Sequence, residues 1–247
     1  MGKRNNVYLR VAKFAERQMD AAIAISKGLR DLYLGMKISK DDKIELIHYG
    51  LDFPDPVRQE EEKRFWKNQL VLVGRLTAFK GHRYAIDCLP QVLETHPDTG
   101  LLIVGSGQLE DELKELVAKL QLQDHVRFLG YSPEARAYMA SSDIVLVPSV
   151  SEGFGVVVLE TFSVKKPIVA FDVPSLNEHI QSGENGFLAN PYVLEEYAAF
   201  ISELLNSESK RSSFGEAGYN KLQDYYSLTR MTEETMCFYD KLNLPRN

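Results

Sequence analysis

The segment SVSEGFGVVVLE begins at Ser149 and carries two carboxylates, Glu152 and Glu160, eight residues apart. Gly153 and Gly155 follow the first carboxylate and open a helix pattern. The amides and dipole at a helix N-terminus favour a phosphate or a sugar hydroxyl, and a carboxylate can hold two neighbouring hydroxyls, as on a ribose. Taken separately, Glu152 suits a helix cap and Glu160 an exposed helix position. Together they indicate a site for a ligand that carries hydroxyls and negative charge.

Two cations, Arg75 and Lys80, lie in the segment GRLTAFKG, which follows another strand pattern. Two cations at one strand end suit an anionic group such as a diphosphate. Alone, they are better explained as a solvated surface pair. Beside the two carboxylates, they favour a nucleotide that carries a sugar. The segment is not a phosphate-binding loop of the GxxxxGK[ST] type.

The segment GSGQLEDEL contains Gly105 and Gly107, which allow close backbone approach where a strand turns into a helix. A dinucleotide fingerprint requires a third glycine at position 110, where this chain has Glu110. The two glycines are therefore expected to line the ligand. A nicotinamide-dependent dehydrogenase, which belongs to another class of enzyme, is disfavoured.

Short apolar runs alternate with amphipathic helix patterns along the chain, which predicts an α/β fold with a doubly wound, mainly parallel, Rossmann-like sheet. In such a sheet, ligands bind at the carboxyl ends of the strands, where all three segments lie. The predicted strands are 69–74, 100–105, 125–130, 143–149, 166–172 and 186–189, and the helices are 82–95, 109–120, 133–142, one from about 155, 176–181 and most of 193–242. Residues 21–26 and 43–52 are predicted strands outside this alternation.

Composition excludes several classes of protein. The chain has 247 residues, of which 44% are apolar and 26% are charged, and its net charge is -6. These values are ordinary for a globular protein, and they give no basic footprint for nucleic acid. No apolar run is long enough for a transmembrane helix. The basic N-terminal segment lacks the apolar core of a signal peptide, so membrane contact is peripheral at most, and a plain surface helix is favoured.

The cysteines and histidines give little sign of a metal site. Cys88 and Cys237 lie in predicted helices among apolar neighbours and are expected to be buried free thiols, in keeping with a reducing cytoplasm. The five histidines are scattered and are expected in loops or at the surface. His82 follows Lys80 closely and could reach a phosphate, which we weigh as a minority interpretation.

Seven segments in order carry a resemblance to a known family: AIAIS, IHYGLD, VGRLTAFKG, LLIVGSGQLEDEL, VRFLGY, SSDIVLVPSVSEGFGVVVLETFSVKKPIVA and ENGFL. They cover nearly the whole chain. The chain resembles the C-terminal, donor-binding half of a family-4 retaining glycosyltransferase (glycosyl transferases group 1) of the two-domain GT-B fold. The paired glutamates with Gly-Phe-Gly, combined with the Arg and Lys loop, make this resemblance specific.

The resemblance implies roles for the residues above. Arg75 and Lys80 would contact the donor diphosphate and stabilise the leaving group, and Glu152 would bind hydroxyls of the transferred sugar. We expect these three to act in catalysis, with Glu152 as a hydroxyl binder rather than a nucleophile. Tyr131 and the backbone near Gly130 would border the base. The residues expected to bind the donor are Gly74, Gly105, Gly107, Tyr131, Gly153, Phe154, Gly155 and, on the ribose, Glu160.

The resemblance also implies a hexosyltransferase-type reaction. The family transfers a sugar from a nucleotide-diphosphate sugar to a glycan or lipid-linked acceptor, with retention and without a cofactor or metal. The sequence contains no Asp-x-Asp triplet that would hold a divalent cation. Polysaccharide biosynthesis in the cytoplasm, with at most peripheral contact at the inner face of the membrane, is the expected setting.

The resemblance leaves the acceptor-binding domain largely unmatched. Residues 1–58 would be a remnant of that domain with a linker, residues 59–226 the nucleotide-sugar-binding domain, and residues 227–247 a C-terminal crossover helix. Three hypotheses stay open: a donor-binding half completed by a second subunit or a longer parent chain, a non-catalytic nucleotide-sugar-binding subunit, and a small enzyme completed by a second copy. We favour the first.

Overall fold

The computed structural model describes residues 3–53, 57 and 60–242. The chain divides into two compact units. The smaller unit combines Met1–Asp52 with Tyr225–Asn247, and the larger is Phe53–Asp224. The assignment of these parts to an acceptor-domain remnant, a donor domain and a crossover helix stays a prediction.

The smaller unit joins a two-stranded parallel sheet to the C-terminal helix. Its elements are α1 (Lys3–Arg17), β1 (Ala22–Ala24), α2 (Lys27–Gly35), η1 (Asp41–Lys43), β2 (Ile44–Leu46) and α10 (Leu228–Lys241). β2 is shorter than the predicted strand 43–52, because the backbone after it bonds to the C-terminal segment. Leu51 N donates to Tyr226 O at 2.8 Å, and the guanidinium of Arg230 donates to His48 O at 3.0 Å.

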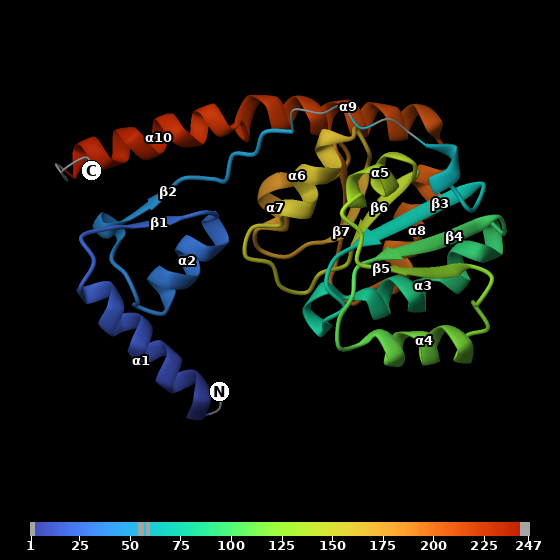
Figure 1. The fold of residues 1–247 in the computed structure, drawn as a ribbon, viewed down its shortest axis with the longest axis horizontal. Helices are drawn as coiled ribbons and strands as arrows, with labels where there is room; N and C mark the ends of the chain where they lie inside the picture. Colours follow the sequence, from blue (N-terminus) through green and yellow to red (C-terminus); the bar gives the residue numbers. More distant parts are fainter. Residues whose placement is uncertain (1–2, 54–56, 58–59, 243–247) are drawn as a thin grey trace. The chain divides into compact units, whose positions relative to one another are not determined.

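The larger unit is built on a six-stranded sheet, drawn in Figure 1, in which every strand pair is parallel. The strand order is β5-β4-β3-β6-β7-β8, which confirms the predicted doubly wound α/β fold. Its elements are η2 (Glu61–Lys63), β3 (Asn68–Val73), η3 (Ala78–Lys80), α3 (His82–Thr95), β4 (Thr99–Val104), α4 (Glu110–Lys119), β5 (Val126–Gly130), α5 (Ala135–Ala140), β6 (Ile144–Val147), α6 (Val156–Ser163), β7 (Ile168–Phe171), α7 (Leu176–His179), β8 (Gly186–Ala189), α8 (Leu194–Leu205) and α9 (Glu208–Tyr225).

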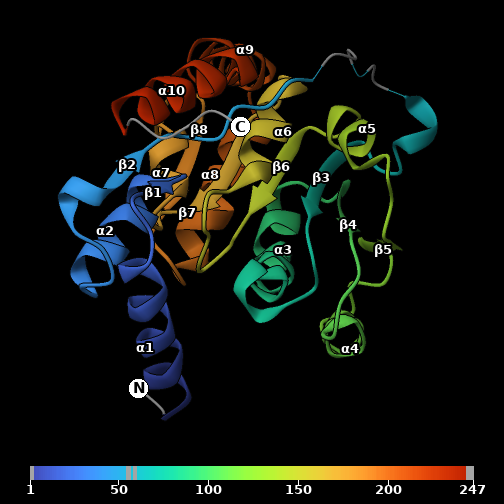
Figure 2. The ribbon, with the colours of Figure 1, turned by 60° about the vertical axis from the view of Figure 1, so that its left-hand side comes forward.

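Helices cover both faces of this sheet (Figures 1 and 2). α3, α4 and α8 pack on one face, and α5 and α6 pack on the other. α9 adds a layer over α6, where Gly218 lies against the ring of Phe162. Every residue of β4, β6 and β7 is buried, as the apolar runs predict for strands covered on both faces. This rigid core fixes the loops at the strand ends.

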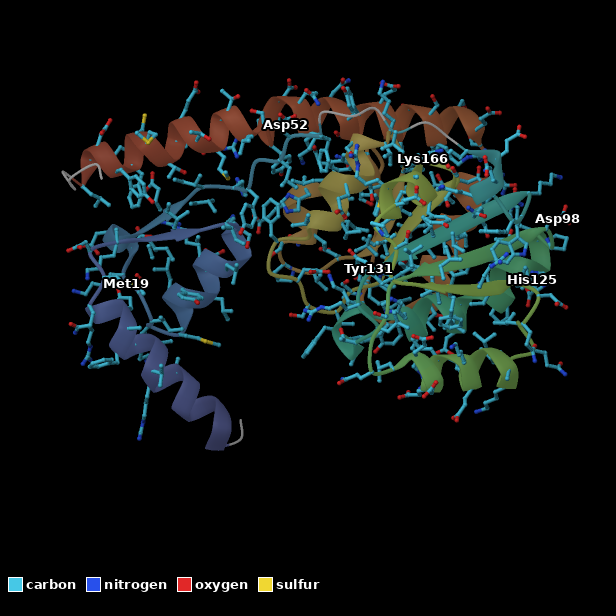
Figure 3. The ribbon with its side chains drawn as sticks, viewed as in Figure 1. Met19, Asp52, Asp98, His125, Tyr131 and Lys166 are labelled. Atoms are coloured by element: carbon cyan, nitrogen blue, oxygen red, sulfur yellow. The ribbon has the colours of Figure 1, made fainter. Side chains whose placement is uncertain are left out.

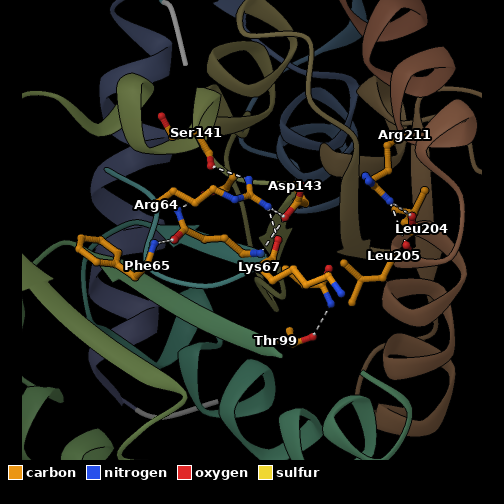
Figure 4. A network of polar contacts seen from close by, with 12 residues as sticks. Arg64, Phe65, Lys67, Thr99, Ser141, Asp143, Leu204, Leu205 and Arg211 are labelled. Carbon is orange, nitrogen blue, oxygen red and sulfur yellow. Dashed lines mark hydrogen bonds and ion pairs between the residues drawn. The ribbon is translucent and has the colours of Figure 1, made fainter. Parts of the chain in front are cut away.

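The chain reverses its direction of winding between β3 and β6. It runs outward from β3 to β4 and β5, then returns to place β6 beside β3. At the amino ends of these two strands, the carboxylate of Asp143 accepts from Gln69 N at 2.7 Å and pairs with Arg64 at 2.6 Å (Figure 4). This tie holds β3 and β6 in register, so the loops at their carboxyl ends have fixed relative positions.

The prediction of two buried thiols is half wrong. Cys88 is buried in α3, and the pKa of its thiol is raised to about 12 by burial. Cys237 is exposed on α10, because no element of the described chain covers that side of the helix. The two cysteines are free thiols, as predicted.

None of the described helices combines the length and the apolar composition needed to cross a bilayer. α9 has 18 residues, but only four of them are buried, and charged side chains occur along it.

Candidate functional site

The two predicted ligand loops meet at the carboxyl ends of β3 and β6. The ammonium of Lys80 lies 2.5 Å from Oε1 of Glu152. The hydroxyl of Ser149 donates to the same oxygen at 2.8 Å. The Glu152 side chain is 9% exposed and that of Lys80 26%, so the pair is largely shielded from water. The structure therefore brings together two of the three residues predicted to act in catalysis, at the point where α/β sheets bind ligands.

The N-terminus of α6 opens directly beyond this ion pair. Gly155 is its N-cap, with φ 87°, and no side chain in the described structure caps the helix. A residue with a Cβ would be strained at that φ, and the Cβ would lie 2.8 Å from Cδ2 of Leu176. The first amides of a helix lack intrahelical acceptors, so this end suits an anion or a hydroxyl oxygen.

Two residues that the sequence analysis did not predict, Ser175 and His179, donate hydrogen bonds to backbone carbonyls of the Glu152–Gly155 loop. The hydroxyl of Ser175 donates to the carbonyls of Glu152 and Gly153, at 3.2 and 3.1 Å. Nε2 of His179 donates to Phe154 O at 2.6 Å, and its ring lies edge-on to the Phe154 ring. His179 was expected in a loop or at the surface, but it is fully buried. Its place in the helix pattern after a strand was a weak signal for this role.

Glu160 lies on α6, one and a half turns from the helix start, and is half-buried rather than exposed. Burial raises the pKa of its carboxyl, and the positive charges of Arg136 and Lys80 partly offset this effect. Glu160 thus shares an electrostatic environment with Lys80. Arg136, on α5, was not predicted, and nothing in the sequence around it distinguishes it from a surface arginine.

Arg75 and Gly74 lie at the end of β3. Arg75 is exposed, and its guanidinium has no carboxylate partner within 4.0 Å among the residues that the structure describes. The methylene chain of Lys80 passes over Gly74, where an added Cβ would lie 3.6 Å from Cδ of that lysine. Arg75 is thus a cation open to solvent in the loop that also carries Lys80.

Gly105 and Gly107 bring the loop after β4 against the loop after β3. A Cβ at Gly105 would lie 1.9 Å from Gly74 O, and one at Gly107 would lie 2.5 Å from Leu76 O. Close backbone approach is as predicted, but it is made between two loops. α4 begins only at Glu110, after an N-cap at Leu109, so these glycines do not open the helix.

Tyr131 follows β5 at the edge of the sheet and is 80% exposed. Figure 3 places it at the end of the sheet opposite Asp98 and His125. Gly130 before it has φ 72°, which turns the chain away from the strand. Since β4 separates β5 from β3, Tyr131 lies apart from the Lys80–Glu152 pair. Its role at a base, like the roles of all these residues, stays a prediction.

No group of three or more metal-ligating side chains occurs in the described part of the chain. His82 was also expected in a loop or at the surface, and it is buried. A hollow of about 410 Å³ lies elsewhere, at the amino edge of the sheet, and none of the predicted site residues lines it. In that hollow, burial lowers the pKa of Lys166 to about 8.

Comparison with known proteins gives concordant results. The family model described as glycosyl transferases group 1 matches residues 55–221. An uncharacterized glycosyltransferase, MJ1607, from Methanocaldococcus jannaschii is 29% identical over 230 residues, which are 88% of this chain and 59% of that protein. A D-inositol 3-phosphate glycosyltransferase from Corynebacterium aurimucosum is 30% identical over 183 residues, 71% of this chain and 44% of that protein.

The solved structures agree in fold. The crystal structure of Anabaena Alr3699/HepE in complex with UDP superposes with a TM-score of 0.85, at 24% identity, over 95% of this chain and 68% of that chain. The chain spans about half the length of the two curated relatives, 59% and 44%. With a GT-B-like Rossmann sheet and a family match over most of its length, the chain belongs to the glycosyl transferases group 1 and resembles their C-terminal, donor-binding half.

Proposed function

We propose that this chain binds a nucleotide-diphosphate sugar and provides the donor half of a glycosyltransferase. The enzyme would transfer a hexose to a glycan or lipid-linked acceptor, with retention and without a metal. One observation carries the proposal. The loop predicted to bind the diphosphate (residues 74–81, the phosphate loop) and the loop predicted to bind the sugar (residues 149–155, the sugar loop) meet through Lys80 and Glu152, at the point where the sheet reverses its winding.

The geometry suits a division of roles among the site residues. Arg75 is exposed and unpaired in the described structure, so it is available to an incoming diphosphate. Lys80 is engaged by Glu152 and would exchange this partner for a phosphoryl oxygen when donor binds. The freed carboxylate of Glu152, still held by Ser149, would then accept from hydroxyls of the transferred sugar. Positive charge would meet the leaving group as the glycosidic bond breaks.

The α6 helix would serve the nucleotide. Its N-terminus, opened by Gly153, Phe154 and Gly155, would face a phosphate or sugar oxygen. Glu160 would hold the two ribose hydroxyls, and its half-buried position gives the carboxylate little competing water. Ser175 and His179 would keep the loop in place during this exchange.

Metal independence and retention are the finer parts of this proposal. The sequence has no Asp-x-Asp triplet, so the leaving-group charge would fall to Arg75, Lys80 and the helix amides. The Ser149 hydroxyl would still donate to Glu152 after Lys80 leaves, which favours hydroxyl binding over nucleophilic attack. Retention follows from the family resemblance. The cytoplasm, or the inner face of the membrane, is the setting we propose.

A second candidate is a non-catalytic nucleotide-sugar-binding subunit that requires a separate acceptor-domain partner. The curated relatives are matched over 59% and 44% of their lengths, so sugar transfer is tested separately from donor binding. Both candidates bind a donor, and they differ in whether sugar transfer needs another chain.

Binding is tested by calorimetry with UDP, GDP, ADP and dTDP, since Alr3699/HepE was crystallised with UDP. We expect one nucleotide to bind the wild type, and Arg75→Ala and Glu160→Ala to weaken it about tenfold each, which is ~1.4 kcal/mol. Glu115→Ala, at an exposed position of α4, is the matched control. Nucleotide at 100 times its Kd should stabilise the fold by about 2.7 kcal/mol, which a thermal shift detects. Absence of binding by all four contradicts the proposal.

Catalysis is tested with the matching nucleotide sugar, in buffer with and without EDTA. We expect release of nucleoside diphosphate to survive chelation, and the anomeric configuration of the product, followed by NMR, to match that of the donor. Activity abolished by EDTA and restored by Mg²⁺ contradicts metal independence. Absence of transfer, with donor binding intact, favours the subunit. Hydride transfer with NAD(P)H would revive the dehydrogenase interpretation.

A further inference from the structure

His82 is a buried imidazole with unused hydrogen-bonding capacity. Its side chain is 1% exposed, and neither Nδ1 nor Nε2 has a hydrogen-bond partner of normal geometry. Buried polar side chains in proteins are nearly always hydrogen-bonded, and leaving one unsatisfied costs free energy. An apolar side chain of similar size would fill the same space without this cost. The polar ring at this position therefore suggests a partner that the free chain does not supply.

The ring lies at the edge of the site described above. His82 is the first residue of α3, a helix of 14 residues, and Gly81 before it is the N-cap. Lys80 is close enough to shift the titration of the ring, and so is the backbone of Gly74. Lys80 also covers Gly74 with its methylene chain. The imidazole thus lies against the phosphate loop, near Gly74 and Lys80.

The N-terminus of α3 is itself uncapped in the described structure. No side chain bonds to it, and the amides of His82 and Arg83 have no acceptor among the described residues. Such amides bind anions, particularly phosphate, because their dipoles point at the ligand. The free amides and the unsatisfied ring are independent observations at the same helix end.

The ring is neutral at physiological pH. Burial, together with the positive charge of Lys80, lowers the pKa of His82 to about 4, while a hydrogen-bonding contact between the ring and the Gly74 backbone acts in the other direction. A neutral imidazole has one N–H donor and one bare acceptor nitrogen. In a complex, its N–H can therefore turn from the Gly74 backbone to a phosphoryl oxygen, while its bare nitrogen can accept from the Lys80 ammonium.

We propose that His82, the Lys80 ammonium and the N-terminal amides of α3 form a subsite for a phosphoryl group of the donor, and that the His82 ring donates its N–H to this group. The proposal deepens the proposed function and rests on it. When Lys80 leaves Glu152 for the phosphate, its methylene chain moves off Gly74, the residue whose backbone lies against the ring. The free structure thus holds an unsatisfied group that the donor satisfies.

Two variants test this subsite, with UDP, GDP, ADP and dTDP screened first against the wild type. His82→Leu removes the hydrogen-bonding atoms, and His82→Gln keeps an N–H donor. For the nucleoside diphosphate that the wild type binds best, we expect His82→Leu to weaken binding at least tenfold and His82→Gln by less than threefold. The matching nucleoside, which has no phosphate, should bind both variants as it binds the wild type. The melting temperature of ligand-free His82→Leu should equal or exceed that of the wild type.

Unchanged diphosphate affinity in His82→Leu overturns the subsite while leaving the proposed function intact. If the wild type binds none of the four diphosphates, the proposed function fails and the subsite falls with it. A second measurement needs no variant of uncertain folding. In ¹⁵N-histidine-labelled wild type, saturating diphosphate should shift the His82 ring signals and leave those of His96, at the C-terminal end of α3, in place. Unshifted His82 signals at saturation overturn the proposal.

Discussion

The Lys80 ammonium and the Glu152 carboxylate, 72 residues apart in sequence, lie 2.5 Å apart at the carboxyl ends of β3 and β6. Each belongs to a loop that has a ligand-binding pattern of its own. Their contact makes one site of the two patterns. It also means that the cation expected to meet a diphosphate is occupied in the free chain, so the donor binding that we propose would include an exchange of partners.

The Lys80–Glu152 pair should contribute measurably to stability because it is shielded from water. We expect Lys80→Met and Glu152→Gln each to lower the free energy of unfolding, with a coupling energy of about 1–2 kcal/mol in a double-mutant cycle followed by urea denaturation. Lys114 and Glu110, an exposed pair on α4 at 2.7 Å, provide a matched control cycle with coupling below about 0.5 kcal/mol. Equal coupling in the two cycles would show that shielding has no effect here.

Glu160 should make stability depend on pH in a defined direction. Burial raises the pKa of its carboxyl above the ordinary value of 4.5. A folded pKa above the unfolded one means that folding favours the protonated form, so this stabilisation is complete below about pH 4.5 and is lost as pH rises through the folded pKa. Glu160→Gln should therefore raise the melting temperature at pH 7 more than at pH 4, while weakening nucleotide binding. Glu115→Gln, which is exposed, should show neither effect. An increase in melting temperature on Glu160→Gln that is larger at pH 4 than at pH 7 would contradict a raised pKa for this carboxyl.

Gly81 should tolerate no side chain, because it combines a left-handed backbone with a close neighbour. Its φ is 69°, and a Cβ would lie 1.8 Å from Pro148 O. Gly183 has φ 88° with nothing within 4 Å of an added Cβ, so it isolates the backbone term. We expect Gly183→Ala to cost about 1–2 kcal/mol, and Gly81→Ala to cost roughly 1–3 kcal/mol more for the forced backbone shift. Chemical denaturation measures both, and equal losses would refute the close approach.

His179 should hold the sugar loop in its binding conformation, in addition to packing in the core. His179→Phe keeps a ring but removes the donor to Phe154 O, which should cost about 1–3 kcal/mol. Tyr197→Phe is the control, since it removes a buried hydroxyl that donates to Val169 O at 2.9 Å, away from the loop. Denaturation should show losses in both variants, and calorimetry should show weaker nucleotide binding only in His179→Phe. Unchanged binding in both would assign His179 to the core.

Periodicity predicted the main elements well because their apolar faces are continuous. The predicted helix 82–95 coincides with α3, where Ala85, Ile86, Leu89 and Val92 form one buried stripe. The strand 43–52 was overlong because β2 ends at Leu46, and the residues after it bond to a segment nearly two hundred residues away, as Arg230 does to His48. An apolar run does not show whether its backbone bonds to a neighbouring strand or to a distant segment such as the one that contains Arg230.

The site residues could be predicted where the residue types and their spacing within one loop indicate a ligand. Lys80 and Glu152 were named from their loops, but Ser175 and His179 reach the same loop from another strand end. The burial of His82 and the exposure of Cys237 depend on which elements cover each helix face. Such facts arise from packing, which a single sequence does not display.

The return of the chain from β5 to β6 has a consequence for synthesis. The Lys80 loop and the Glu152 loop become neighbours only after β6 has paired with β3, and the supports on α7 lie further along the chain. During translation, β3, β4 and β5 emerge first, with the apolar edge of β3 uncovered. A nascent chain that ends before β6 thus carries the loop of Lys80 without the loop of Glu152, and the open edge of its β3 strand is a target for chaperones.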